Sequence, residues 1–280
     1  MRVKNRHLIK KIVAGTNQRK PIKGFETNIF QFFPREEMSF LVNGQEVQPN
    51  GETHSGSFEY NGQAKRTVLK HGRVQYSVSS GSISEEHGFF EYIPEIDSCV
   101  LKSGKRIYKT DVVENGKLYV YDPTKKNSIL KIGEQKYSDG LSLNGEFSYN
   151  SYRALHFLSN GVCIFPNKDI HKGSFDYNEE INRPELTNGS KQTKQGIEDG
   201  EFEYFPDLGK YFLTFGKKEV GLVSGDGVCD SQLVEDGEFD WSDELSSVGL
   251  KEGTREISGV IKEIIEFGST QEYTHLIDII

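Results

Sequence analysis

Histidine, cysteine and acidic side chains are the residues here that could act as metal ligands, nucleophiles or general acids and bases. The seven histidines show neither the HExxH pattern nor a pair four residues apart, so they predict no metal site. Cys99, Cys163 and Cys229 are odd in number and widely spaced, which favours free thiols in a reducing compartment. No catalytic or phosphate-binding motif is present, and we predict neither a catalytic residue nor a cofactor.

The composition is typical of a β-rich chain that does not bind nucleic acid. Its 280 residues include 29 Gly, 18 Phe and 13 Tyr, and its formal net charge is −8 with a pI near 5.5. Acidic chains are repelled by nucleic acids and by anionic membranes. The sequence contains no 18-residue apolar run and no secretory leader, which predicts a cytoplasmic protein without a transmembrane segment.

A 15-residue pattern recurs eight times, about 28 residues apart. It has an aromatic residue at position n, an aromatic residue at n+2, Leu at n+11 and Gly at n+14. Another glycine precedes most units at n−2, where we expect a turn with a positive φ angle. The residues at position n are Phe30, Phe58, Phe90, Tyr119, Phe147, Phe175, Phe202 and Phe239.

Each unit is predicted to be an antiparallel β-hairpin. Aromatic and polar residues alternate at n to n+2, as in a strand with one buried face. If n+2 lies opposite n+11, residues n+5 to n+8 form the turn. Acidic n+1 residues then face lysines at n+12. The expected cross-strand ion pairs are Glu59–Lys70, Glu91–Lys102 and Asp240–Lys251.

The repeat predicts an all-β fold with a domain at 28–253. We expect hairpins, or three-stranded meanders that use part of each connector, arrayed into an extended, twisted antiparallel sheet. A β-solenoid with one coil per unit is the alternative, although it would stack the acidic residues about 4.8 Å apart. Residues 1–27 form a basic lead outside the repeat. Residues 254–280 form a cap, for which the apolar spacing from Ile257 to Ile265 predicts a helix.

The units resemble MORN repeats and the related tyrosine–glycine repeats of bacterial antitoxin-like proteins. The resemblance is carried by Gly200, Phe202, Tyr204 and Gly216 and by their equivalents over 28–253. MORN units are shorter, near 23 residues, and have more internal glycines. The resemblance implies a non-enzymatic platform for proteins or lipids and transfers no site residue.

An acidic row at position n+1 is the candidate partner-binding face. Asp176 and Glu203 have Thr187 and Thr214 at n+12, so we expect their charges to be available to a basic partner. The row consists of Glu59, Glu91, Asp176, Glu203 and Asp240.

These features favour a non-catalytic repeat protein that acts as a protein-binding scaffold. One alternative is an enzyme or carbohydrate-binding protein with a site built from connector loops, particularly 217–238. That connector contains SGDGVCDSQ at 224–232, whose composition is similar to that of a calcium loop but which lacks the ligand positions of an EF-hand. Another alternative is a structural assembly component. The sequence identifies neither the partner nor the oligomeric state.

Overall fold

The computed structural model describes residues 28–79, 81–150, 155–223, 229–242, 247–257 and 260–265. These residues form a single 17-stranded sheet. The strands are β1 (Ile29–Phe33), β2 (Met38–Val47), β3 (Thr53–Asn61), β4 (Arg66–Gln75), β5 (Ile83–Ile93), β6 (Ser98–Tyr108), β7 (Val113–Asp122), β8 (Asn127–Lys136), β9 (Ser142–Asn150), β10 (Leu155–Ile164), β11 (Ile170–Asn178), β12 (Arg183–Gln192), β13 (Gly196–Phe205), β14 (Lys210–Val223), β15 (Cys229–Ser242), β16 (Ser247–Ile257) and β17 (Val260–Ile265).

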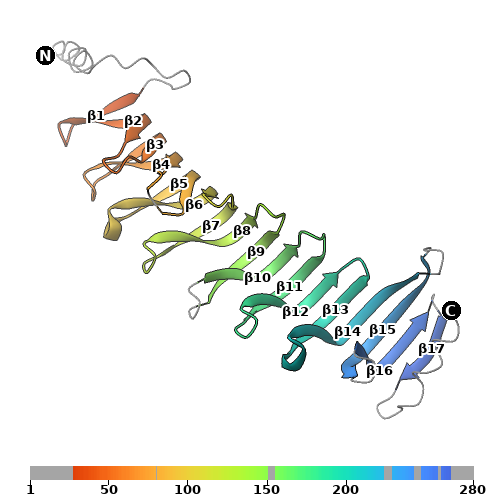
Figure 1. Ribbon diagram of the computed structural model, residues 1–280. Helices are drawn as coiled ribbons and strands as arrows, with labels where there is room; N and C mark the ends of the chain where they lie inside the picture. Colours follow the sequence, from red (N-terminus) through yellow and green to blue (C-terminus); the bar gives the residue numbers. More distant parts are fainter. Residues whose placement is uncertain are drawn as a thin grey trace.

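The sheet is a continuous antiparallel meander. Each strand pairs with the next strand in the sequence, from β1–β2 through to β16–β17. Figure 1 shows the result as a long, open array with β1 and β17 at opposite ends. The predicted all-β extended sheet is confirmed. The β-solenoid alternative is wrong, because a coil would place equivalent strands of successive units side by side, whereas here a second strand separates them.

All eight predicted hairpins are present, but their register differs from the predicted one. Position n, not n+2, lies opposite n+11 in every hairpin, as in Phe58↔Leu69 and Phe90↔Leu101. The pairing then shifts by one residue, so that position n+12 is the extra residue of a β-bulge in most units. The bulge was not predicted because alternation alone does not reveal an inserted residue.

The six hairpin turns that the structure describes occupy n+4 to n+7, one residue earlier than predicted. Two of them contain a 3₁₀ turn that starts at proline, Pro94–Ile96 and Pro206–Leu208. The last turn residue has a positive φ angle in each described case, as at Asp97 (47°) and Gly209 (61°). Its N–H donates to the proline carbonyl over 3.2 Å in the first case and 3.1 Å in the second. This left-handed residue reverses the chain into the second strand.

A row of glycines crosses the sheet from β2 to β16, with one glycine on each strand. The residues at n−2 and n+14 pair with each other within a hairpin, as in Gly56↔Gly72, and between hairpins, as in Gly72↔Gly88. A Cβ on Gly72, whose φ angle is 154°, would lie 2.0 Å from the carbonyl oxygen of Ser55. We call this the glycine row. The prediction of a turn at n−2 is wrong, because these glycines lie inside long strands. The row consists of Gly44, Gly56, Gly72, Gly88, Gly104, Gly116, Gly133, Gly145, Gly161, Gly173, Gly189, Gly200, Gly216, Gly237 and Gly253.

The glycine row divides each hairpin into two parts. On the turn side, which we call the arm, the two strands of a hairpin pair with each other only, except that the residue next to the glycine can also pair with the neighbouring hairpin, as in Asn43↔Ser57. On the other side, neighbouring hairpins also pair, as from Gln45↔Ser55 to Val47↔Thr53. The connector pieces that suggested a third strand are therefore continuations of the second strand of each hairpin. Successive arms contact through side chains instead, as where the rings of Phe212 and Trp241 lie 5.6 Å apart.

The core follows positions n and n+11. Of these sixteen residues, fifteen are buried, and Phe30 of the first hairpin is the exception at 60% exposure. The same cluster includes Val74 and Cys163, which lie beyond the glycine row. The n+2 aromatic residues are half-buried or exposed. The core is therefore a narrow strip that runs along one face of the sheet.

The C-terminal segment differs from the predicted helix. Residues up to Ile257 belong to β16, and Val260–Ile265 form strand β17, which pairs with β16. The branched residues in this segment suit a strand, and the free edge of β16 supplies the backbone partners that a strand needs. Residues 1–27 and 266–280 lie outside the described residues. Within the described part of the chain, no helix is long and apolar enough to cross a membrane.

Replacing a member of the glycine row should destabilise the fold strongly. In Gly173→Ala the new Cβ would overlap the carbonyl oxygen of Asn188, 2.0 Å away, at a φ angle of 146°. We expect a loss of at least about 2 kcal/mol in the free energy of unfolding, measured by chemical denaturation. Gly62→Ala is the control, because a Cβ there meets no atom within 4 Å. Equal effects of the two changes would show that close approach at the glycine row does not matter.

Candidate functional site

The five predicted acidic residues lie on the first strand of their hairpins, and all are exposed. The predicted ion pairs are present. Lys70 Nζ lies 3.2 Å from Glu59, Lys102 Nζ lies 3.2 Å from Glu91, and Lys251 Nζ lies 3.9 Å from Asp240. Each lysine occupies position n+12, so the bulge brings it to the acid despite the changed register.

Asp176 and Glu203 form no ion pair with any described residue. At their n+12 positions, Thr187 and Thr214 donate their hydroxyls to the carbonyls of Ser174 and Glu201, each over 3.2 Å. Asp176 accepts a bond only from the adjacent backbone N–H of Tyr177. The bulge residue thus decides whether the acidic side chain is neutralised.

The acidic row is not continuous along the sheet. Val120 and Ser148 occupy position n+1 in the fourth and fifth hairpins. They separate Glu59 and Glu91 from the second group, Asp176, Glu203 and Asp240. The structure therefore brings the predicted residues together as two groups rather than as one face.

Two grooves lie along the array, one beside Glu59 and Glu91 and the other on the core face of the C-terminal hairpins. One groove of about 660 Å³ lies at the second and third hairpins and is lined by Glu59 and Glu91 with Lys70, Lys102 and Lys117. A second groove, of about 680 Å³, extends over the last three hairpins. Its aromatic and charged lining includes Phe202, Tyr211, Trp241, Lys191, Glu198 and Lys218.

A second row, which the sequence reasoning missed, carries buried charges across the sheet. Its members lie two residues beyond the glycine row, on the core side of the sheet, and pair with one another in register. We call it the inner row. It consists of Glu46, His54, Val74, Glu86, Arg106, Glu114, Gln135, Leu143, Cys163, His171, Lys191, Glu198, Lys218, Glu235 and Arg255. In the sequence, the inner row could have been found by its regular spacing, because each of its residues lies two positions from a repeat glycine.

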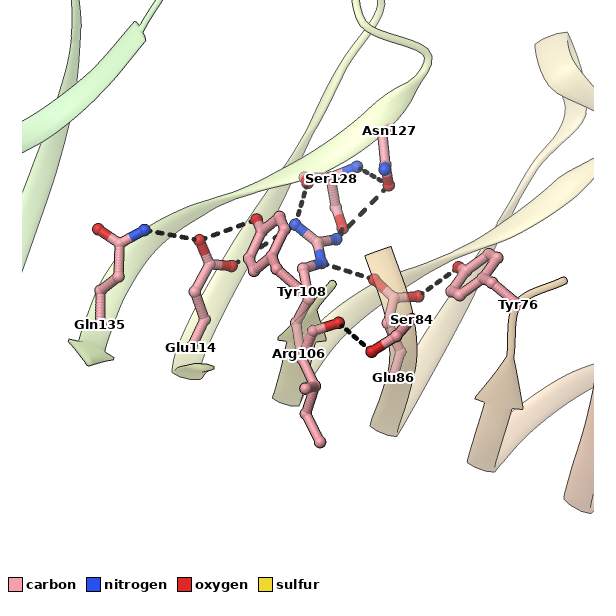
Figure 2. Close-up of polar contacts among 10 residues, drawn as sticks. Tyr76, Ser84, Glu86, Arg106, Tyr108, Glu114, Asn127, Ser128 and Gln135 are labelled. Atoms are coloured by element: carbon pink, nitrogen blue, oxygen red, sulfur yellow. Dashed lines mark hydrogen bonds and ion pairs between the residues drawn. The ribbon is translucent and has the colours of Figure 1, made fainter. Parts of the chain in front are cut away.

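Arg106 is the centre of the most buried part of the inner row. The exposed fractions of Glu86, Arg106 and Glu114 are 0%, 2% and 5%. Figure 2 shows the guanidinium between the two carboxylates. Its Nε donates to Glu86 over 2.7 Å, its Nη1 and Nη2 each donate to Ser128 over 2.7 Å, and its Nη1 lies 3.6 Å from Glu114 Oε2.

Tyrosine and amide side chains complete this network. Tyr76 donates to Glu86 over 2.7 Å, and Tyr108 donates to Glu114 Oε1 over 3.0 Å. Gln135 also donates to Glu114 Oε1, over 3.3 Å. Burial raises the pKa of Tyr76 and of Tyr108. These hydroxyls therefore stay protonated and donate to the two carboxylates, and burial also raises the pKa of Glu114.

The other chemistry-bearing side chains that the structure describes do not converge on a catalytic centre. Burial raises the pKa of Cys99 to about 11 and that of Cys163 to about 12, so these free thiols are poor nucleophiles. No group of three His, Cys, Asp or Glu residues in the described ranges could hold a metal ion. The 217–238 connector is mostly strand, in β14 and β15, and residues 224–228 lie outside the described residues.

Comparison with protein-family models and with curated proteins finds no match for this chain. The finer resemblance to MORN repeats stays a prediction.

Removing the buried guanidinium should cost far more than removing an exposed ammonium. Arg106→Met leaves Glu86 and Glu114 buried without their cation, and we expect a loss of about 3–5 kcal/mol in the free energy of unfolding. Lys102→Met, which breaks an exposed pair with Glu91, should cost less than about 1 kcal/mol. Chemical denaturation compares the two variants. Similar losses would show that the inner row is not a determinant of stability.

Acidification should destabilise the protein through two histidines. Burial, together with nearby Lys125 and Lys191 respectively, lowers the pKa of His156 and His171 to about 4, against 6.5 for a free histidine. The unfolded chain therefore binds these protons first, and stability falls as the pH drops from about 6.5 to about 4. Unfolding at pH 7 and pH 4.5 should show a smaller loss for the His156→Gln/His171→Gln variant than for the wild type. An imidazole resonance of either residue titrating near pH 6.5 would contradict this assignment.

Proposed function

We propose that this chain is a non-catalytic β-repeat protein that binds another protein through the acidic surface of its C-terminal hairpins. The observation that carries the proposal is the contrast within the acidic row. Glu59, Glu91 and Asp240 each have a lysine partner, whereas the exposed carboxylates of Asp176 and Glu203 have none among the residues that the structure describes. Unpaired surface carboxylates are available for contact with a basic partner.

An apolar anchor lies close to these charges. Phe215, which is 59% exposed, lies in register between Glu201 of β13 and Glu238 of β15. Glu201 and Glu203 are two residues apart on one strand, so both carboxylates point to the same face. Glu238 is paired with Lys251 over 3.0 Å, so the exposed ring with Glu201 and Glu203 on its other side matches a partner surface that presents basic and apolar side chains together.

The shape of the sheet supports a binding role. Hairpin repeats present a long, open surface of the kind that binds other proteins. The resemblance of the hairpins to MORN repeats, which implies a non-enzymatic platform, agrees with this. A cytoplasmic location is part of the proposal, and the free thiols of Cys99 and Cys163 support it.

Reversal of the two unpaired charges should abolish partner binding without unfolding the protein. The tagged wild type and the Asp176→Lys/Glu203→Lys variant are used for affinity capture from the native cells, after circular dichroism shows that both are folded. We expect at least one protein to bind the wild type directly when purified, and its affinity for the variant to fall by at least about tenfold.

The matched control is Glu37→Lys/Glu95→Lys, which changes the net charge equally at two exposed hairpin turns. This variant should retain the partner. Loss of binding in both variants would indicate a general charge effect. Capture of no direct partner by the wild type, or equal capture by all three proteins, would overturn the proposal and favour a loop-built site or a structural role.

A further inference from the structure

The face of the sheet opposite the core strip, which we call the outer face, is positively charged over the second to fourth hairpins. In each hairpin it is formed by the bulge residues and by the residues from n−5 to n+1 and from n+10 to n+17 that alternate with core-facing ones. In the second to fourth hairpins cations outnumber carboxylates there. The cations are Lys70, Arg73, Lys102, Lys105, Lys117, Lys131 and Lys136, and the carboxylates are Glu59, Glu85, Glu91 and Glu134.

Three lysines carry the excess positive charge of this region, which we call the basic patch. Each of its four carboxylates forms an ion pair with a cation of the same patch. Lys105, Lys117 and Lys131 are exposed and form no ion pair with any described residue. Lys131 donates to the carbonyl of Phe147 over 2.9 Å, which leaves its charge uncompensated.

The outer face of the sixth to eighth hairpins has the opposite charge. Its lysines are Lys172, Lys217 and Lys251, of which the last two pair with Glu219 and Glu238. Six exposed carboxylates form no ion pair within the described part of the chain, against one such lysine, Lys172. They are Asp176, Asp199, Glu201, Glu203, Asp236 and Glu252. We call this region the acidic patch, and it contains the surface proposed above for protein binding.

Each patch also has an exposed aromatic side chain at its centre. Phe89 in the third hairpin is 56% exposed and Phe215 in the seventh is 59% exposed. Each is adjacent to a member of the glycine row, Gly88 or Gly216, so the two rings lie at equivalent heights on their strands. Phe89 lines the groove of about 660 Å³ together with Lys117. The basic patch therefore presents the basic and apolar side chains together that the acidic surface requires.

The two patches are placed symmetrically along the array. The fifth hairpin, β9 and β10, lies between them (Figure 1), and its outer face has serine at both n+1 and n+12 and one charged residue, Glu146. A twofold axis through this hairpin would place the second, third and fourth hairpins of one copy against the eighth, seventh and sixth of another. Both basic patches would then meet both acidic patches.

We propose that two copies of this chain form a twofold-symmetric dimer through their outer faces, with the basic patch of each copy on the acidic patch of the other. This inference rests on the proposed function, because it names a second copy as the partner of the acidic surface. Physiological salt screens the repulsion between two chains of net charge −8 beyond about 8 Å, so complementarity at contact decides.

The patches are large enough for a stable interface. Six strands span about 29 Å, and five residues of a strand span about 16 Å. Two such contacts give each copy roughly 900 Å² of interface, close to the about 800 Å² per partner of a standard protein complex.

Sedimentation velocity of the purified full chain tests the dimer. We expect a species of about 63 kDa, twice the 31.7 kDa of one chain, with a dissociation constant below about 10 μM that rises with salt. Lys105→Glu/Lys117→Glu and Asp176→Lys/Glu203→Lys should each weaken the dimer at least about tenfold, because each places like charges in contact. Glu37→Lys/Glu95→Lys, at two exposed turns, should leave it unchanged.

Restored association identifies the two surfaces as partners. An equimolar mixture of the two weakened variants, and the single chain that carries all four changes, should each dimerise within about threefold of the wild-type affinity, since opposite charges again face each other. Circular dichroism shows whether each variant is folded, and if one is not, the wild-type mass and its salt dependence decide.

A wild type that stays monomeric at about 100 μM would overturn the dimer, and so would a dimer that either weakened variant leaves unchanged or failure of the mixture to associate. Growth beyond the dimer with concentration would contradict the closed twofold arrangement. A monomeric wild type that still captures a different protein through Asp176 and Glu203 would overturn this inference alone and leave the proposed function standing.

Discussion

At the glycine row, a carbonyl oxygen of one strand occupies the space where a Cβ of the next strand would lie, about 2.0 Å from it at Gly72. The close approach of a carbonyl oxygen recurs at thirteen of the fifteen glycines, and at Gly44 and Gly116 the side chains of Asn28 and Tyr119 take this space instead, so no other amino acid fits the row. The row fixes the register of the whole meander, because a shift by one residue would bring a side chain into the contact. It also separates the arms, which pair only within a hairpin, from the region where all strands pair. The glycine row therefore sets the positions of the core strip, the bulges and the grooves.

The inner row follows from the same constraint. Residues two positions beyond each glycine necessarily face the core side and stand opposite one another across the sheet. A charged residue there loses most of its contact with water, and it is tolerated only beside an opposite charge or a hydrogen-bond donor. The order Glu86, Arg106, Glu114 satisfies this requirement within hydrogen-bonded geometry, and the C-terminal hairpins satisfy it with alternating acidic and basic residues. Neighbouring strands therefore stabilise one another in two ways, through the backbone contacts at the glycine row and through the paired charges of the inner row.

The sequence was sufficient to predict the eight hairpins, their antiparallel array, the three lysine–acid pairs and the exposed acidic residues. It was insufficient for the register, because the bulge at n+12 changes the pairing without changing the spacing of Phe58 and Leu69. The inner row was missed for a related reason: its residues lie in segments of varying length and were assigned to connectors. The C-terminal helix was wrong because residues 257–265 combine helical spacing with branched side chains, and the free edge of β16 decides in favour of a strand. Tertiary pairing, which one sequence does not display, determined each of these outcomes.

The proposed acidic surface arises from an interruption of otherwise regular pairing. On the surface, a lysine at the bulge neutralises the acid of the same hairpin, and threonine at that position donates to the backbone instead, which leaves Asp176 and Glu203 charged. In a repeat protein whose units stabilise one another, most positions must satisfy the common pattern. Positions that leave a charge without its usual partner add nothing to the stability of the array, and recognition of another molecule is the role that such charges are able to fill.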